Sequence, residues 1–334
     1  MKHINIPVFI PHLGCPNECV FCNQRSISGK TVFEESSVDF EINTALSTIG
    51  NDKNVEIAYF GGSFTGIDRD LMIRLLEKAN GYIDAGKAYG IRLSTRPDYI
   101  NEEILDILEK YRVKDIELGI QSMSDEVLSA SKRGHDSKCS YDACRLIKKR
   151  GFNLIGQMML GLPCSDAEKE CETARKLCEL GVDGARIYPT VVFSGTELDA
   201  MRVKGIYTPL TFEDTVKRCT DVLEIFDKNN VKVIRIGLCS QDNLFDEKTV
   251  TAGDYSSAIG EITQSELFFR KISSALASLS NMPEKLTVYC PTGCTSKVVG
   301  HKKRNSDRIK KLYGIKDIKV IEKNSLLGYN IMIN

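Results

Sequence analysis

The strongest constraint on the fold is a repeated alternation between short apolar, β-branched runs and longer amphipathic stretches. Strand–helix–strand units of this kind form right-handed parallel crossovers, and their mostly apolar strands are covered on both faces. Strands are predicted at 5–10, 55–60, 91–95, 115–120, 153–160, 184–189 and 232–237. Helices are predicted between them, at 36–49, 68–86, 101–111, 138–150, 165–180 and 211–229.

Six or seven such units are visible, whereas a closed barrel of this type needs eight. The sequence therefore predicts an α/β fold, a partial (β/α)6-type TIM barrel with a small C-terminal α+β unit. After the last barrel strand the pattern becomes polar and glycine-containing, and then comes an amphipathic helix at 264–280. We predict a barrel domain, a connecting loop and helix, and a small basic domain, at 1–237, 238–285 and 286–334.

The charge balance limits how this chain can bind a polyanion such as a nucleic acid. Lys plus Arg and Asp plus Glu number 45 each, so nucleic-acid binding requires a local charge excess. No apolar run approaches the ~18 residues of a membrane helix. Two prolines, Pro7 and Pro11, interrupt the apolar start, and no small-residue cleavage site follows. We expect a cytoplasmic protein without a membrane partner, whose 12 cysteines are thiols, metal ligands or buried side chains.

The loop after the first predicted strand contains a C-x3-C-x2-C pattern formed by Cys15, Cys19 and Cys22. In a (β/α) barrel such a loop lies at the face where reactive chemistry collects. Three thiolates can hold one face of a 4Fe–4S cluster; electron-transfer clusters take four, so three leave one iron open. A zinc site that adds His12 is an alternative. Buried thiols without a ligand are less favoured, because residues 16–18 (PNE) suggest an exposed loop.

The pattern C-x3-C-x-aromatic-C, with Phe21 as the aromatic residue, resembles the radical S-adenosylmethionine superfamily. In that family, S-adenosyl-L-methionine chelates the open iron through its amino and carboxylate groups. An electron from the reduced cluster then breaks the sulfonium C–S bond and releases a 5′-deoxyadenosyl radical. The resemblance implies a 4Fe–4S cluster, S-adenosyl-L-methionine as cofactor and a flavodoxin- or ferredoxin-type electron donor.

Further strings in the same order support this resemblance. "YFGGSFTG" (59–66) matches the family's Gly-Gly turn, which binds the methionine amino group; a plain strand-to-helix turn is the alternative. Glycine has no Cβ, so Gly61 and Gly62 would let backbone approach a ligand closely. Ser63 stands where many members have an acid.

"LSTRPDYI" (93–100) and "ELGIQSMSDEVL" (117–128) resemble the radical domain of the Elongator catalytic subunit. Together with "KRGH" (132–135) and "GQMMLGLP" (156–163), they imply cofactor contacts by Ser94, Thr95, Gln121, Arg133, Gln157 and Met158. A methionine pair on a strand is otherwise ordinary core. An isolated arginine is otherwise a surface residue.

The Elongator resemblance extends through "ARIYPTVVFSGTELDAMRVKGIY" (185–207) and covers residues 5–237. Oxygen-independent coproporphyrinogen oxidases share some of these strings. The Elongator subunit spaces its cluster cysteines more widely and carries an acetyltransferase domain. We expect the residues after 237 to be too few for that domain, so no acetyl-CoA chemistry is expected.

The remaining cysteines carry weaker signals. Cys171 and Cys178 share one helix face with alanines, which indicates core packing. Cys164 and Cys239 follow predicted strands and could reach the barrel mouth. Two thiols in "YCPTGC", Cys290 and Cys294, are too few for a metal site.

The C-terminal stretch 297–323 has ten Lys or Arg and three acids. Its "GHKK" loop, predicted between a strand and a helix, resembles in part the GXXG loop with which KH domains clamp RNA. We therefore predict RNA contacts by Gly300, Lys302, Lys303 and Arg304; a solvated basic helix is the alternative. RNA is the expected substrate. The alternatives are a small metabolite such as a porphyrinogen, or a regulatory protein that keeps the cluster without turnover.

Overall fold

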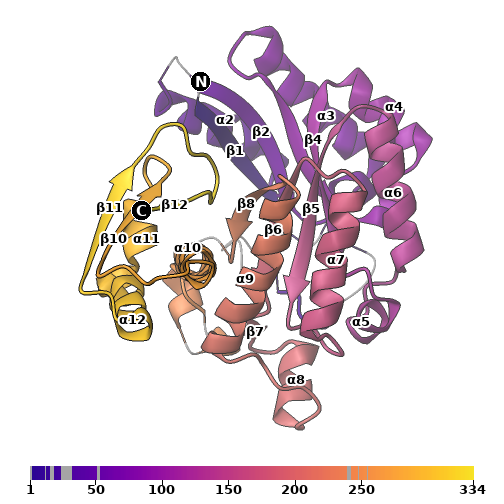
Figure 1. Cartoon of the computed structure of the whole chain (residues 1–334). Coiled ribbons are helices and arrows are strands. Elements are labelled where there is room, and N and C mark those ends of the chain that lie inside the picture. Colours follow the sequence, from indigo (N-terminus) through magenta and orange to yellow (C-terminus); the bar gives the residue numbers. More distant parts are fainter. Residues whose placement is uncertain are drawn as a thin grey trace.

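The computed structural model describes residues 2–11, 13–15, 19–23, 32–50, 53–238, 242–246, 248–253 and 255–334. Seven parallel strands form one sheet in the order β1-β2-β3-β4-β5-β6-β8, which curls into a half-barrel (Figure 1). The strands are β1 (Lys2–Ile10), β2 (Lys53–Gly61), β3 (Gly90–Thr95), β4 (Val113–Gln121), β5 (Asn153–Leu160), β6 (Gly184–Pro189) and β8 (Lys232–Ile236). All seven predicted strands are present, and the predicted fold class is confirmed.

Helices cover the outer face of this sheet (Figure 1). They are α2 (Val38–Ser47), α3 (Arg69–Asp84), α4 (Glu102–Lys110), α6 (Ser137–Lys149), α7 (Ala167–Glu179) and α9 (Phe212–Lys228). Five of them begin at a side chain that accepts a hydrogen bond from a backbone N–H three residues later: Asp68, Asn101, Asp136, Asp166 and Thr211. Such caps satisfy N–H groups that the helix itself leaves without a partner.

Several elements were not predicted. Two are the short helices α5 (Asp125–Ala130) and α8 (Glu197–Val203). Another is a two-stranded sheet of β7 (Val192–Phe193) and β9 (Val250–Ala252), whose second strand lies where no structure was expected. Strands this short are stabilised by a partner that is distant in sequence, so local propensity gives little signal for them.

The C-terminal unit contains β10 (Lys285–Cys290), α11 (Thr295–Val299), α12 (Arg304–Tyr313), β11 (Asp317–Glu322) and β12 (Met332–Ile333). Its strand order is β11-β10-β12, with β10 parallel to β11 and antiparallel to β12. The predicted position of the "GHKK" loop was wrong in one respect. The loop joins two helices, α11 and α12, because the unpredicted α11 precedes it.

The helix α10 (Ile259–Ala277) links the two units, and its neighbouring residues pack in different cores. Leu267 belongs to the core of the half-barrel. Phe268 and Ile272 pack with Leu286 and Ile309 in the core of the C-terminal unit. The boundaries at 237 and 285 stay a prediction. Among the described residues, no helix is both long and apolar enough to cross a membrane.

Candidate active site

The loop that carries the three clustered cysteines follows β1 and is tied to other loops by its backbone. Cys15, Cys19 and Cys22 are half-buried and form no disulfide. The N–H of Val20 donates to the carbonyl of Ser131 at 3.3 Å, and the N–H of Leu198 donates to the carbonyl of Val20 at 2.8 Å. Phe21 packs beside Val20 against a small apolar cluster.

No three Cys, His, Asp or Glu side chains in the described ranges already form a metal-binding arrangement. His12 and residues 16–18 lie outside the described residues, so the zinc alternative and the loop's exposure stay untested. Burial raises the pKa of the Cys15 thiol, while Arg96 and Arg133 favour its thiolate. Soft thiolate ligands beside cationic side chains suit an iron–sulfur cluster.

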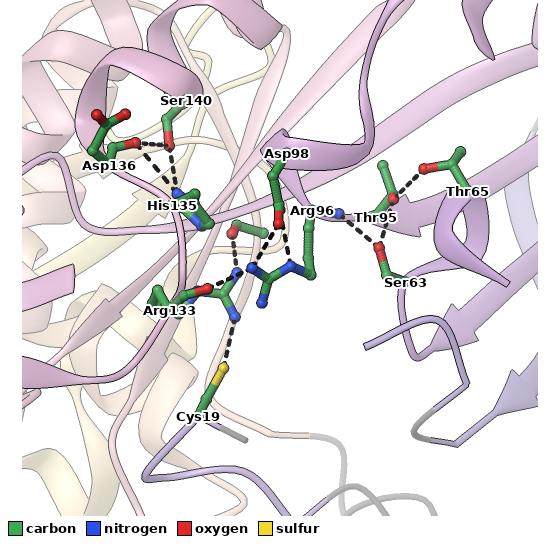
Figure 2. Close-up of polar contacts among 11 residues, drawn as sticks. Cys19, Ser63, Thr65, Thr95, Arg96, Asp98, Arg133, His135, Asp136 and Ser140 are labelled. Carbon is green, nitrogen blue, oxygen red and sulfur yellow. Dashed lines mark hydrogen bonds and ion pairs between the residues drawn. The ribbon is translucent and has the colours of Figure 1, made fainter. Parts of the chain in front are cut away.

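Arg133 links the cysteine loop to the end of β4 (Figure 2). Its Nη1 donates to Cys19 Sγ at 3.3 Å, and its Nη2 donates to the carbonyl of Gly119 at 2.6 Å. Arg96 donates through Nη2 to the carbonyl of Arg133, and it forms a two-point ion pair with Asp98 at 2.9 Å for both bonds. Two guanidinium groups therefore lie beside the cysteine loop.

The glycine pair after β2 is packed against the cysteine loop itself. Gly61 has φ +112°, which favours glycine, and a Cβ on Gly62 would lie 1.9 Å from the Leu13 carbonyl oxygen. The N–H of Gly62 donates to the carbonyl of Ile10 at 2.7 Å. The lack of a Cβ is therefore first required by the chain's own backbone, a reason that the motif alone did not indicate.

Ser63, in the place of an acid, joins a buried chain of hydroxyl groups. Its Oγ lies 2.9 Å from Thr95 Oγ1, which in turn lies 2.6 Å from Thr65 Oγ1. The N–H of Arg96 donates to Ser63 Oγ at 3.2 Å. These bonds connect the ends of β2 and β3. The neighbouring Ser94 is half-buried.

Gln121 Oε1 and Arg96 Nη1 are buried near this point and have no hydrogen-bond partner within the described structure. Gln121 also has φ +68°, a strained value for a residue with a side chain. Buried polar groups are nearly always paired, so an orphan acceptor and an orphan donor indicate a polar ligand. The residues present thus fit a bound cofactor.

The two predicted β5 residues point to opposite faces of the sheet. Gln157 Nε2 donates to Glu117 Oε2 at 2.9 Å on the inner face of the half-barrel. Met158 is fully buried in the core between sheet and helices. The position of Met158 therefore matches the alternative interpretation, in which a methionine on a strand is an ordinary core residue.

A charged network on the inner face was not predicted. Arg92 contacts Glu56 at 2.9 Å, Asp115 at 3.0 Å and Glu117 at 3.1 Å. Arg186 contacts Glu117 at 2.7 Å. Burial, and then Glu56, raise the pKa of Asp115 to about 8. The signal in the sequence was one or two of these charged residues within each of four otherwise mostly apolar strands, β2, β3, β4 and β6.

Other residues of this region were also missed, although the strings that contain them were recognised. Arg96 and Asp98 lie in "RPDY" and His135 lies in "KRGH". The Nδ1 of His135 lies 3.3 Å from the carbonyl of Asp136 and 3.4 Å from Ser140 Oγ (Figure 2). Burial, and then Arg133, lower the pKa of His135 to about 4, so this imidazole is neutral at physiological pH.

The basic loop of the C-terminal unit has a defined shape. Gly300, Lys302 and Lys303 have φ values of +80°, +50° and +65°. Lys302, Lys303 and Arg304 are exposed. The buried Asn305 anchors the loop, because its Nδ2 donates to the carbonyl of Ser265 on α10 at 2.8 Å.

A second cationic surface lies between α6 and α7, on the outer face of the half-barrel. A groove of about 740 Å³ is lined there by Lys138, Tyr141, Arg145, Lys148, Lys149, Lys176 and Glu179, among others. Lys138 pairs with Asp142 and Lys148 with Asp183, which reduces the charge excess. The C-terminal loop is therefore not the only place where cations gather.

The other cysteines are mostly packed. Cys290 is buried and Cys294 is half-buried in the C-terminal core. Cys171 and Cys178 are half-buried. Cys164 is exposed and has φ +61°. Cys239 lies outside the described residues.

Comparisons with known proteins identify the family of this chain. Residues 9–177 match the family model described as Radical SAM superfamily, and residues 182–268 match the Radical SAM C-terminal domain. The chain is 32% identical over 235 residues to Uncharacterized protein MJ0486 of Methanocaldococcus jannaschii, covering 67% of this chain and 72% of that protein.

Two further similarities concern longer proteins. The tRNA uridine(34) acetyltransferase of M. jannaschii is 27% identical over 245 residues, which is 61% of this chain and 45% of that protein. The archaeal Methanocaldococcus infernus Elp3, solved with residues 1–46 deleted, has a TM-score of 0.65 and 22% identity. That match covers 81% of this chain and 63% of the other, and it shows a shared fold. The chain thus spans less than two thirds of either protein.

Proposed function

The chain belongs to the radical S-adenosylmethionine superfamily, and on that premise we propose that this enzyme modifies RNA, with a tRNA-like molecule as substrate. Enzymes of the superfamily use a 4Fe–4S cluster and S-adenosyl-L-methionine and need a reductant. When bound, these groups supply reductive cleavage of the cofactor. The acetyltransferase activity named for one relative is not part of the proposal.

The residues proposed to hold these groups line one end of the half-barrel. Cys15, Cys19 and Cys22 would ligate the cluster. Gln121 Oε1 and Arg96 Nη1, both buried without a partner in the described structure, are suited to a polar cofactor. Contacts by Phe21, Gly61, Gly62, Ser63, Ser94, Thr95, Arg133 and Gln157 remain proposed from the motifs.

The observation that carries the RNA proposal is the exposed loop between α11 and α12. It presents Lys302, Lys303 and Arg304 from a backbone that Asn305 anchors to α10. On a chain with 45 basic and 45 acidic residues, a fixed local excess of this kind can position a phosphate backbone. Its glycine and basic residues also resemble in part the GXXG loop with which KH domains clamp RNA.

The name of one relative supports the same substrate class, because that protein is a tRNA uridine(34) acetyltransferase. A polynucleotide is too large to enter a half-barrel. It would be held from outside while only the target base turns into the mouth.

The test compares two triple variants with the same change in net charge. Lys302→Glu, Lys303→Glu and Arg304→Glu should weaken RNA binding at least tenfold. The slope of log affinity against log salt should fall by about 2 to 3, since each phosphate contact contributes ~0.7–0.9. Lys311→Glu, Lys316→Glu and Lys319→Glu on α12, the following loop and β11 form the matched control and should change both quantities far less.

A second arm identifies the substrate. RNA from a deletion strain should lack one modified nucleoside that RNA from the parent strain contains, and mass spectrometry would detect this difference. Unchanged RNA together with an accumulated small metabolite would favour the metabolite alternative. If the loop variants bind RNA like the wild type but Arg145→Glu with Lys149→Glu does not, RNA is held by the groove between α6 and α7 instead.

A further inference from the structure

Two almost fully buried arginines lie beside the cysteine loop. Arg96 is 4% exposed and Arg133 is 6% exposed. Arg133 donates to Cys19 Sγ at 3.3 Å and to the carbonyl of Gly119 at 2.6 Å, so its guanidinium is held at two corners. A full positive charge is thereby fixed against one of the three clustered thiols.

Arg96 contacts the backbone of Arg133 (Figure 2). Its Nη2 donates to the backbone carbonyl of Arg133, and its Nε and Nη2 bind Asp98 at 2.9 Å each. Its own N–H donates to Ser63 Oγ at 3.2 Å. Arg96 thus ties the end of β3 to the loop after β2 and to the loop after α5. Among the described residues, Arg96 makes no hydrogen bond to the cysteine loop and reaches Cys19 through Arg133.

The physical consequence concerns electron transfer. Reduction adds one negative charge to an iron–sulfur cluster. An N–H donor to a ligating sulfur and a nearby cation stabilise the reduced form more than the oxidised form. Charge effects are larger in a buried environment than in water. Both guanidinium groups act in this direction, and Asp98 offsets the charge of Arg96 without contacting Cys19.

We propose that Arg96 is a positioning residue: it holds the Arg133 guanidinium against Cys19, and the pair raises the reduction potential of a cluster bound by Cys15, Cys19 and Cys22. A flavodoxin- or ferredoxin-type reductant can then supply the electron more readily. This inference rests on the cluster and is independent of the substrate.

The experiment is a redox titration of the reconstituted cluster without S-adenosyl-L-methionine. Electron paramagnetic resonance monitors the fraction of reduced cluster at each potential. Arg133→Met should lower the midpoint potential most, because charge and hydrogen bond are both lost. Arg133→Lys should lower it less, since the charge stays but an ammonium cannot bridge Cys19 Sγ and the Gly119 carbonyl in the same way. Arg96→Met should also lower the potential, although Arg96 does not touch the sulfur, and Arg96→Lys should restore part of it.

The matched control is Arg218→Met on α9, which removes a part-buried arginine paired with Glu170 at 3.1 Å. It should leave the potential unchanged. Arg133→Met and Arg96→Met proteins with full iron content and the wild-type potential would show a merely structural role and overturn the inference. Should the methionine variants fail to take up iron, Arg133→Lys decides: a potential equal to that of the wild type contradicts the proposal.

Discussion

The carbonyl oxygen of Leu13 occupies the space that a Cβ on Gly62 would need, at a distance of 1.9 Å. The N–H of Ser63 donates to the same carbonyl at 3.0 Å. The turn after β2 and the start of the cysteine loop are therefore interlocked two residues before Cys15. The glycine pair associated with cofactor binding therefore also packs against the loop that carries the proposed cluster ligands.

Gly62→Ala should therefore reduce cluster uptake as well as cofactor binding. The added methyl group must displace the Leu13 backbone, because no flexible side chain is available to move instead. Iron and sulfide analysis after anaerobic reconstitution measures the effect. Gly81→Ala on the exposed face of α3, where a Cβ meets nothing within 4 Å, is the control and should keep full uptake. A Gly62→Ala protein with wild-type iron content would contradict the interlock.

Serine in place of any one of Cys15, Cys19 and Cys22 should abolish the brown chromophore, because each change removes one of the three proposed thiolate ligands. The wild type should bind roughly four iron and four sulfide per chain. Cys178→Ser, at a half-buried position on α7, should retain the chromophore. Loss of iron in the Cys178 variant alone would point to different ligands.

Asn305→Asp should loosen the basic loop while leaving cofactor cleavage unaffected. A carboxylate cannot donate to the carbonyls of Ser265 and Val298, which Asn305 Nδ2 contacts at 2.8 and 3.3 Å. An unsatisfied buried group of this kind costs about 1–3 kcal/mol. The midpoint temperature of thermal unfolding and the affinity for RNA should both decrease. Uncoupled cleavage of S-adenosyl-L-methionine should match the wild type; a parallel loss would show that the loop also supports the half-barrel.

The buried Asp115 should make stability depend on pH. Its folded pKa is raised to about 8, mainly by burial, so the folded state keeps a proton that the unfolded carboxyl loses near pH 4. The contribution of Asp115 is then fully favourable below about pH 4 and declines as the pH rises toward 8. Asp115→Asn, which stays neutral, should remove this decline.

Urea unfolding of the wild type and Asp115→Asn between pH 5 and 8.5 provides the measurement. The difference in unfolding free energy should shift in favour of the asparagine variant as the pH rises, and then level off above about 8. A difference that is constant across this range would show that Asp115 is ionised in the folded protein.

The alternation of strands and helices was readable in the sequence because each element follows from local pattern and composition. The cysteine spacing and the glycine pair were readable for a related reason: their chemistry depends on residues only a few positions apart. The C-terminal loop was found from its charge. Its place between two helices was not, since α11 has only five residues and a weak local signal.

Only the tertiary structure decided which polar groups meet. Arg133 reaches Cys19 across 114 positions, and Arg96 reaches the Arg133 carbonyl across 37. The network of Arg92, Glu117 and Arg186 likewise joins β3, β4 and β6, although β5 lies between the last two in the sheet. Such contacts depend on strand order and register, which bring distant residues to one end of a sheet. The sequence by itself therefore determined the fold class and singled out the three cysteines proposed as cluster ligands, and the packing of parallel strands decided which charges surround them.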